Sequence, residues 1–317
     1  MRKNIAIIGC GYWGKNLIRN YFELGSLYSV CDDNIDLAKS FASLYSCKVQ
    51  TFKEIIADDS IDGIVIASPP NTHREIACAL LAADKNIFVE KPLCMNIDEC
   101  KEIKDYLSKS NGILMVGHLL HYHPGYRKIL SFIKSKEHGA IKHIISKRNS
   151  FGRIRSKEDV LWSFAPHDIS MILGISGCYP ISINRTDYSF IQNGLADISN
   201  LSLGFESFSA HINVSWIHPQ KEQELIIICE DSILIFDDTL AWGEKVSSLS
   251  YDFFHQGEER LLNKQHKKFF PLPPDTEPLK LECNHFLDLL DGKVENITGI
   301  EEATRVIQIL EDSRRSL

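Results

Sequence analysis

One motif constrains the fold of this chain more than any other feature: Gly9-Cys10-Gly11-Tyr12-Trp13-Gly14, which fits G-x-G-x-x-G. It follows the apolar run Ile5-Ala6-Ile7-Ile8, which is typical of a strand, and precedes residues with helical apolar spacing. In that context the glycines permit a tight turn and a close backbone approach, so that amides at the helix N-terminus face a pyrophosphate. The motif therefore predicts a dinucleotide-binding Rossmann fold, and the alternative is an ordinary glycine-rich turn between a strand and a helix.

The first third of the chain alternates short β-branched runs with segments of helical apolar spacing, which is the pattern of a parallel sheet covered by helices. We expect strands at 4–8, 27–31, 61–67, 86–90 and 113–117, with a weaker strand near 48–52. We expect helices at 13–24, 35–44, 72–83 and 97–108. Residues 1–119 are therefore predicted to form a doubly wound α/β domain that binds the dinucleotide.

The pattern changes after His118, where the strands become longer and alternate apolar with polar residues, as in 208–216. A hairpin is expected around Glu230-Asp231, and closing helices are expected at 277–290 and 300–317. Residues 120–317 are therefore predicted to form an α+β domain for substrate binding and oligomerisation. Its sheet should be mostly antiparallel and open on one face.

Composition excludes several classes of protein. A formal net charge of −7 opposes a general nucleic-acid binder, whose surface would be basic. Nine cysteines lie without a Cys-x-x-Cys pair, so neither a disulfide scaffold nor a metal site is predicted. No apolar run approaches the ~20 residues of a membrane span, and the first residues do not resemble a secretory signal. We expect a soluble, cytoplasmic protein with no membrane partner.

Asp32 indicates which dinucleotide is bound. It ends the second predicted strand, where its carboxylate can accept hydrogen bonds from the hydroxyls of the adenosine ribose. Its charge would repel a 2′-phosphate, and the next residues, Asp33 and Asn34, offer no arginine to receive one. The sequence therefore predicts NAD as cofactor, with a solvated turn aspartate as the alternative interpretation.

Two further motifs, Ala67-Ser68-Pro69-Pro70-Asn71-Thr72-His73 and Glu90-Lys91-Pro92, give the chain a specific resemblance. With the glycine motif, they resemble the glucose–fructose oxidoreductase/inositol dehydrogenase (Gfo/Idh/MocA) family over essentially the whole chain. The resemblance implies that Lys91 lies beside the nicotinamide and the substrate hydroxyl. Ligands of doubly wound folds also lie at the carboxyl edge of the sheet, which supports this placement. The predicted cofactor contacts are Gly9, Gly11, Tyr12, Trp13, Gly14, Asp32, Ser68, Pro69, Asn71, His73, Glu90 and Lys91.

His167 is the second catalytic candidate, because Trp162–Ser170 resembles the histidine-bearing helix of the same family. Family members often carry an aspartate four residues before this histidine, whereas this chain has Ser163. Lys91 and His167 are therefore the main acid–base candidates, and a relay of three residues is in doubt. A helix-capping or core histidine is the alternative interpretation of His167.

The segments 117–124, 162–173 and 216–223 look most like the nucleotide-sugar 3-dehydrogenases of the family. The resemblance implies NAD-dependent oxidation of the C3 hydroxyl of UDP-N-acetylglucosamine, or of its glucuronate, on the way to 2,3-diamino sugars of lipid A, O-antigen or another surface glycan. Alternatives are a 3-ketoreductase of a deoxysugar nucleotide and an NAD-binding regulator without enzyme activity. The predicted substrate contacts are His121, Arg153, Arg155 and His167, where the arginines would bind the diphosphate.

The neighbouring histidines His118, His121 and His123 are expected to line the cleft between the domains without binding a metal, since no carboxylate or cysteine lies beside them. A homodimer or homotetramer is also predicted. The helices expected at 162–175 and 277–290 can cover only one face of the antiparallel sheet, so the other face should meet a second subunit.

Overall fold

The computed structural model describes residues 3–152, 154–156, 158–256, 259–274 and 276–315, and the chain forms two compact units. The first unit contains the chain up to Tyr122 together with Glu277–Gln308, and the second contains His123–Thr276 and the chain from Ile309 onward. The expected division at residue 119 therefore needs a correction: the segment 277–308 belongs with the first unit. No helix among the described residues is long and apolar enough to cross a membrane.

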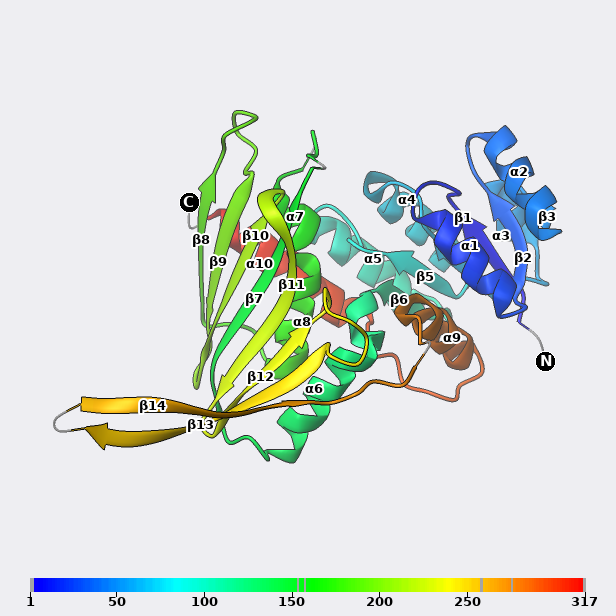
Figure 1. Ribbon diagram of the computed structural model, residues 1–317. Helices are drawn as coiled ribbons and strands as arrows, with labels where there is room; N and C mark the ends of the chain where they lie inside the picture. The colour runs from blue at the N-terminus through cyan, green and yellow to red at the C-terminus, as the bar shows by residue number, and fades with distance from the viewer. Residues whose placement is uncertain (1–2, 153, 157, 257–258, 275, 316–317) are drawn as a thin grey trace. The chain divides into compact units, whose positions relative to one another are not determined.

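The first unit contains a six-stranded parallel sheet in the order β3-β2-β1-β4-β5-β6, which confirms the predicted Rossmann fold (Figure 1). The direction of winding reverses between β1 and β4, so the carboxyl ends of these two strands flank the switch point at which such folds bind ligands. The strands are β1 (Ile5–Ile8), β2 (Leu27–Cys31), β3 (Lys48–Val49), β4 (Gly63–Ile66), β5 (Ile87–Glu90) and β6 (Leu114–Gly117).

The strands of this sheet are buried on both faces, because helices cover both sides of it. The helices before the second unit are α1 (Gly14–Glu23), α2 (Ile35–Tyr45), α3 (Phe52–Ala57), α4 (Pro70–Ala82), α5 (Ile97–Lys109) and the 3-10 helix η1 (Leu119–Tyr122). The weak strand expected near 48–52 is wrong beyond Val49. The side chain of Thr51 accepts a hydrogen bond from the amide of Glu54, and the side chain of Glu54 accepts one from the amide of Thr51. This capping box starts helix α3 where the strand was expected to continue.

The helix α9 (Pro278–Leu290) explains why the C-terminal segment joins the first unit. Its apolar stripe of Leu279, Cys283 and Phe286 is buried in the same core as Tyr21 of α1. The rings of Phe286 and Phe88 of β5 lie 5.7 Å apart. Burying one such aromatic side chain contributes about 2–3 kcal/mol, so α9 is fixed to the parallel sheet. The expectation that it covers the antiparallel sheet is wrong.

The second unit is built on an eight-stranded sheet in the order β14-β13-β12-β11-β7-β10-β9-β8. Only the pair β7–β10 is parallel among the described pairings, so the predicted mostly antiparallel sheet is confirmed. The long hairpin β13–β14 extends past the ends of the neighbouring strands (Figure 1). The strands are β7 (Ile141–Phe151), β8 (Ser182–Tyr188), β9 (Ile198–Gly204), β10 (Ser209–Ser215), β11 (Ile217–Cys229), β12 (Ser232–Asp237), β13 (Val246–Gln256) and β14 (Glu259–Phe269).

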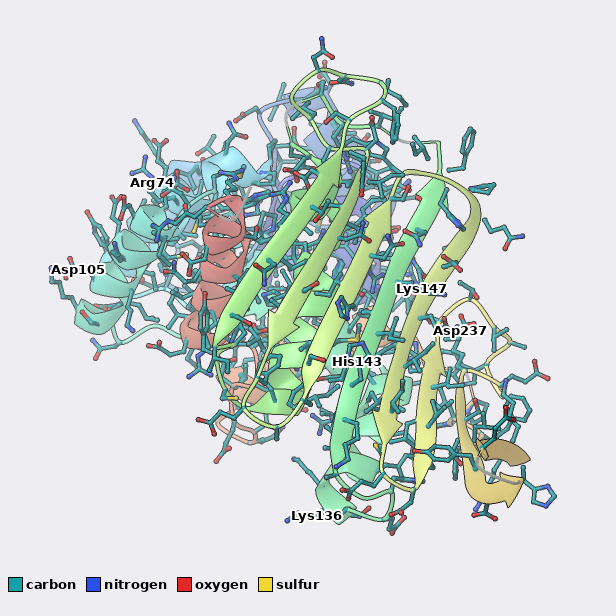
Figure 2. The ribbon with its side chains drawn as sticks, turned by 90° about the vertical axis from the view of Figure 1, so that its left-hand side faces the viewer. Arg74, Asp105, Lys136, His143, Lys147 and Asp237 are labelled. Atoms are coloured by element: carbon teal, nitrogen blue, oxygen red, sulfur yellow. The ribbon has the colours of Figure 1, made fainter. Side chains whose placement is uncertain are left out.

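Helices pack against one face of this sheet, and Figure 2 looks onto the other face. They are α6 (Pro124–Ser135), α7 (Val160–Phe164), α8 (Pro166–Ser176) and the last turns of α10 (Ile300–Arg314), which begins in the first unit. The single helix expected at 162–175 is divided, because Pro166 cannot continue the hydrogen bonding of α7. Along β7, Ile144 and Ser146 face the helices, whereas His143 and Lys147 face outward.

Candidate active site

The turn after β1 has the geometry of a phosphate-binding turn. Gly9 has φ +100°, and a Cβ atom there would lie 2.6 Å from the carbonyl carbon of Ala67, directly after β4. A Cβ atom on Gly14 would overlap the carbonyl oxygen of Gly9. Around Gly11, in contrast, the space for a Cβ atom is open. The turn therefore packs tightly against the end of β4 and leaves room at Gly11, where a pyrophosphate could approach the backbone.

Asp32 lies next to this turn, at the end of β2. Its Oδ2 accepts a hydrogen bond of 2.7 Å from the amide of Cys10, and its Oδ1 accepts one of 2.9 Å from the amide of Asn34. These bonds hold the carboxylate beside the glycine turn. A carboxylate has about four lone-pair sites, so Asp32 can still accept ribose hydroxyls.

His73 connects the turn after β4 with the turn after β5. The side chain is buried, and its Nε2 lies 2.9 Å from the carbonyl oxygen of Ser68, while its Nδ1 lies 2.9 Å from that of Pro92. Burial lowers the pKa of His73 and favours the neutral ring. The structure thus gives His73 a supporting position between backbone carbonyls, and Pro69 and Asn71 are exposed at the start of α4.

Glu90 joins the glycine turn to Lys91. It is buried at the end of β5, where the indole Nε1 of Trp13 donates a hydrogen bond of 2.5 Å to its Oε1. The amide of Lys91 donates to its Oε2 at 3.3 Å. Burial raises the pKa of Glu90 to about 7, although the Trp13 hydrogen bond and the Lys91 charge act in the opposite direction. Trp13 and Glu90 therefore contact each other, while Tyr12 between the glycines is exposed.

His118 directly follows β6, the strand next to the one that Lys91 follows. Glu90 pairs with Gly117 across β5 and β6, so Lys91 and His118 each occupy the first position beyond adjacent strand ends. The ring of His118 is 3% exposed, and its Nε2 lies 3.3 Å from Oε2 of Glu302 on α10. Burial, and then the positive charge of Lys91, lowers the pKa of His118 to about 3, so the ring is neutral. Sequence reasoning missed Glu302, which no local motif marks.

The other two histidines of this segment have different surroundings. His121 is buried in the first unit, with its Nε2 3.7 Å from Oε1 of Glu302. His123 begins the second unit and caps α6, because its Nδ1 accepts the amide of Gly125 at 2.9 Å. Its Nε2 lies 3.2 Å from Oδ1 of Asp238. Within the described ranges, no group of three or more His, Cys, Asp or Glu side chains is placed to hold a metal ion.

His167 is the second residue of α8 in the second unit, and Ser163 lies in the preceding helix α7. Sequence reasoning missed the acid beside it: Asp168 is fully buried and accepts from Ser146 Oγ at 2.7 Å and from Arg148 Nε at 2.8 Å. This ion pair fixes the first turn of α8 to β7. The adjacency of an acid to His167 was the only sequence signal for it.

Of the two arginines predicted to bind a diphosphate, the structure describes Arg155. Arg153 lies outside the described residues. Arg155 is exposed after β7, with its Nε 3.8 Å from Oε1 of Glu158. A pair at that distance on the surface is weak, so the guanidinium of Arg155 stays accessible to a ligand.

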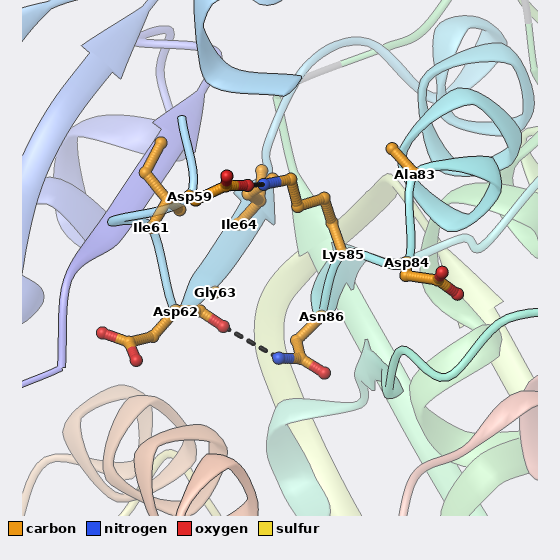
Figure 3. Close-up of a pocket in the computed structure, with 9 residues that line it drawn as sticks. All are labelled: Asp59, Ile61, Asp62, Gly63, Ile64, Ala83, Asp84, Lys85 and Asn86. Atoms are coloured by element: carbon orange, nitrogen blue, oxygen red, sulfur yellow. Dashed lines mark hydrogen bonds and ion pairs between the residues drawn. The ribbon is translucent and has the colours of Figure 1, made fainter. Parts of the chain in front are cut away.

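A pocket at the opposite edge of the parallel sheet is separate from this site. It lies at the amino ends of β4 and β5, where Lys85 Nζ is 3.6 Å from Oδ1 of Asp59 and Asn86 donates to the carbonyl of Asp62 at 2.9 Å (Figure 3). Ligands of doubly wound folds bind beyond the carboxyl ends of the strands. The candidate site is therefore the edge formed by the glycine turn, Asp32 and Lys91.

The sheet order, the glycine turn and the carboxyl edge define a dinucleotide-binding protein of the Rossmann class. A family model described as an oxidoreductase family with an NAD-binding Rossmann fold, Gfo/Idh/MocA, matches residues 3–118. The matched residues contain the six-stranded parallel sheet of the first unit and have the NAD-binding Rossmann fold of this family.

Individual relatives are more distant. UDP-N-acetylglucosamine 3-dehydrogenase of Acidithiobacillus ferrooxidans is 22% identical over 59% of this chain and 59% of its own length. Inositol 2-dehydrogenase of Klebsiella pneumoniae is 29% identical over 44% of each chain. The first matches span 54%, 59% and 65% of the curated relatives, which is less than two thirds of their length. The solved structure of the Acidithiobacillus enzyme has the same fold, with a TM-score of 0.85, 18% identity, and coverage of 100% of this chain and 98% of that one.

Proposed function

We propose that this protein is an NAD-dependent dehydrogenase that oxidises the C3 hydroxyl of a UDP-sugar, with UDP-N-acetylglucosamine as the first candidate. The observation that carries the proposal is the position of Lys91. It directly follows β5 at the carboxyl edge, and the Trp13–Glu90 hydrogen bond ties its neighbour to the glycine turn. A lysine at this edge is close to where a bound dinucleotide presents its reactive ring.

The residues present fit NAD. The open space at Gly11 admits a pyrophosphate, and Asp32 lies where an adenosine ribose would meet the end of β2. Bound NAD supplies the hydride acceptor. Beside the cationic nicotinamide ring, Lys91 acts as the neutral amine and takes the proton from the C3 hydroxyl of the substrate, becoming an ammonium, and His167 assists by hydrogen bonding to the same sugar. Positioned acid–base groups of this kind contribute typically ~10²–10⁴-fold to the rate.

The substrate class rests on the similarity to UDP-N-acetylglucosamine 3-dehydrogenase and on the accessible guanidinium of Arg155. Arginine binds phosphate oxygens through its planar fork, which suits a nucleotide diphosphate. The 3-keto product has the carbonyl group that an aminotransferase needs, which places the reaction before the synthesis of 2,3-diamino sugars for a surface glycan.

The test is a substrate panel. The purified protein is incubated with NAD and, separately, UDP-N-acetylglucosamine, its glucuronate and free inositol. We expect NADH absorbance with a UDP-sugar and a product lighter by two hydrogen atoms, with no NADH from inositol. NADH formation from inositol alone would contradict the nucleotide-sugar assignment, and reduction of a 3-keto sugar without measurable oxidation would favour the ketoreductase.

We also propose that the outward face of the eight-stranded sheet joins copies of this chain. The face presents His143 (Figure 2), one ring nitrogen of which lies 3.0 Å from a ring nitrogen of His211 on the neighbouring strand β10. On the same strand as His143, Asn149 donates to Glu222 at 2.7 Å. Ile145 lies between them on β7 and is only partly buried. Protein–protein interfaces combine an apolar centre with a polar rim, and this face has the apolar Ile145 between such polar pairs.

A further inference from the structure

His118 is held in one tautomer by its surroundings. Its Nε2 lies 3.3 Å from Oε2 of Glu302, and the negative charge of a carboxylate at that distance favours the tautomer with the hydrogen atom on Nε2. In a neutral ring the other nitrogen is then an acceptor. Nδ1 is buried and has no hydrogen-bond partner in the part of the chain that the structure describes. The ring thus presents an unused lone pair inside the protein.

Lys91 occupies the strand end next to that of His118. Strand β5 ends opposite β6, and neighbouring strands lie about 4.8 Å apart, so the residues directly after Glu90 and Gly117 lie side by side. The positive charge of Lys91 already acts on the ring, since it lowers the pKa of His118.

The other titratable groups around His118 come from three elements. Glu302 on α10 lies next to His118, and His121 on η1 lies near the same carboxylate. Glu90 lies opposite Gly117, where a Cβ atom would be 3.0 Å from its Oε2. This Oε2 already accepts a hydrogen bond from the amide of Lys91, and Oε1 of Glu90 accepts one from the indole of Trp13. The lone pair of His118 is therefore a buried acceptor that these contacts leave unused.

We propose that His118, oriented by Glu302, is a positioning residue for Lys91 and accepts a hydrogen bond from the lysine ammonium after it has taken the substrate proton. This inference rests on the proposed function, because Lys91 is taken as the group that receives the hydroxyl proton. The hydrogen bond stabilises the charged amine that forms as the alcohol is oxidised, and it lowers the barrier to proton removal. An unpaired buried acceptor is costly, which favours a partner that arrives during the reaction.

The first test needs no substrate. Nitrogen-15 NMR of the ring of His118 in the resting protein should show protonated Nε2 and unprotonated Nδ1, and Glu302→Gln should yield a mixture of tautomers. Lys91→Met should shift the Nδ1 resonance, whereas Lys85→Met at the opposite edge of the sheet should not. A protonated Nδ1, or identical spectra for the two lysine variants, would overturn the inference whether or not the substrate is a UDP-sugar.

The second test uses turnover. His118→Leu should lower kcat about tenfold to a hundredfold, as expected for a lost hydrogen bond to a charged group, with Kd for NAD within about twofold of the wild type. His118→Gln keeps an acceptor and should retain most of the rate, and His266→Ala on β14 is the control. Equal loss in the leucine and glutamine variants would assign His118 a purely structural role. If the wild type oxidises no sugar nucleotide, the proposed function fails and the NMR experiment alone decides this inference.

Discussion

The indole Nε1 of Trp13 donates a hydrogen bond of 2.5 Å to Oε1 of Glu90, and this bond joins the glycine turn after β1 to the residue before Lys91. It connects the segment after β1 with the end of β5, although β4 lies between these two strands in the sheet. The glycine turn and the strand end that carries Lys91 are therefore connected by a side-chain hydrogen bond. The proposed function assigns cofactor binding and chemistry to different residues of the carboxyl edge, so the two can be separated experimentally.

Lys91→Met should leave the affinity for NAD nearly unchanged and should abolish turnover. In the proposed mechanism, backbone amides near Gly11 hold the pyrophosphate, whereas the amine acts on the hydroxyl proton, a role that contributes typically ~10²–10⁴-fold to the rate. NAD binding measured by fluorescence titration and NADH formation measured by absorbance will separate the two effects. Lys85→Met is the control, and a Lys91→Met variant that keeps most of its activity would remove the lysine from the mechanism.

Asp32→Ala should weaken NAD binding at least tenfold and should affect NADP binding much less. A hydrogen bond to a charged acceptor contributes about 1.5–3 kcal/mol, and the same charge repels a 2′-phosphate. The exposed neighbour Asp33 offers a matched control, Asp33→Ala. Calorimetric titration with both dinucleotides measures the difference, and equal wild-type affinities for NAD and NADP would contradict the role of Asp32.

Glu90 should make the folded protein less stable as the pH rises from about 5 to 7. Burial raises its folded pKa from 4.5 to about 7, so the folded state binds more protons than the unfolded state in this window. Its stabilising contribution is present below the unfolded pKa and is lost as the pH rises through the folded pKa. Burial and the charge of Glu90 also raise the pKa of the fully buried Glu282, which adds a slope of the same sign.

The measurement is urea unfolding of the wild type and of Glu90→Gln across that pH range. The variant should show a smaller decrease of the free energy of unfolding, while the exposed Glu301→Gln should behave as the wild type. A slope unchanged by Glu90→Gln would show that this carboxyl titrates normally in the folded protein.

Sedimentation of the wild type should give a mass of a dimer or tetramer of the 36.0 kDa chain. Ile145→Asp places a charge at the centre of the outward sheet face and should release monomers, because burying an unpaired charge at an interface is costly. Ile191→Asp, in the exposed loop after β8, is the control. A monomeric wild type at micromolar concentration would contradict the proposed interface.

The sequence by itself determined what depends on residues close together in the chain. Ile5–Ile8 and the glycine motif after it specify a strand, a turn and a helix. The turn needs glycine at position 14, because a Cβ atom there would overlap the carbonyl oxygen of Gly9. Alternating side chains likewise determined the antiparallel sheet of the second unit. Lys91 and Asp32 could be placed at the carboxyl edge because every parallel strand ends there.

Tertiary structure alone decided contacts between residues far apart in the chain. The pairing of His118 with Glu302, the position of His73 between Ser68 and Pro92, and the packing of α9 on α1 depend on how complete elements pack. An apolar stripe such as that of α9 states only that a helix must bury one face, and it fits either sheet equally well. The choice between them is set by shape and volume in the assembled core, which no local pattern encodes.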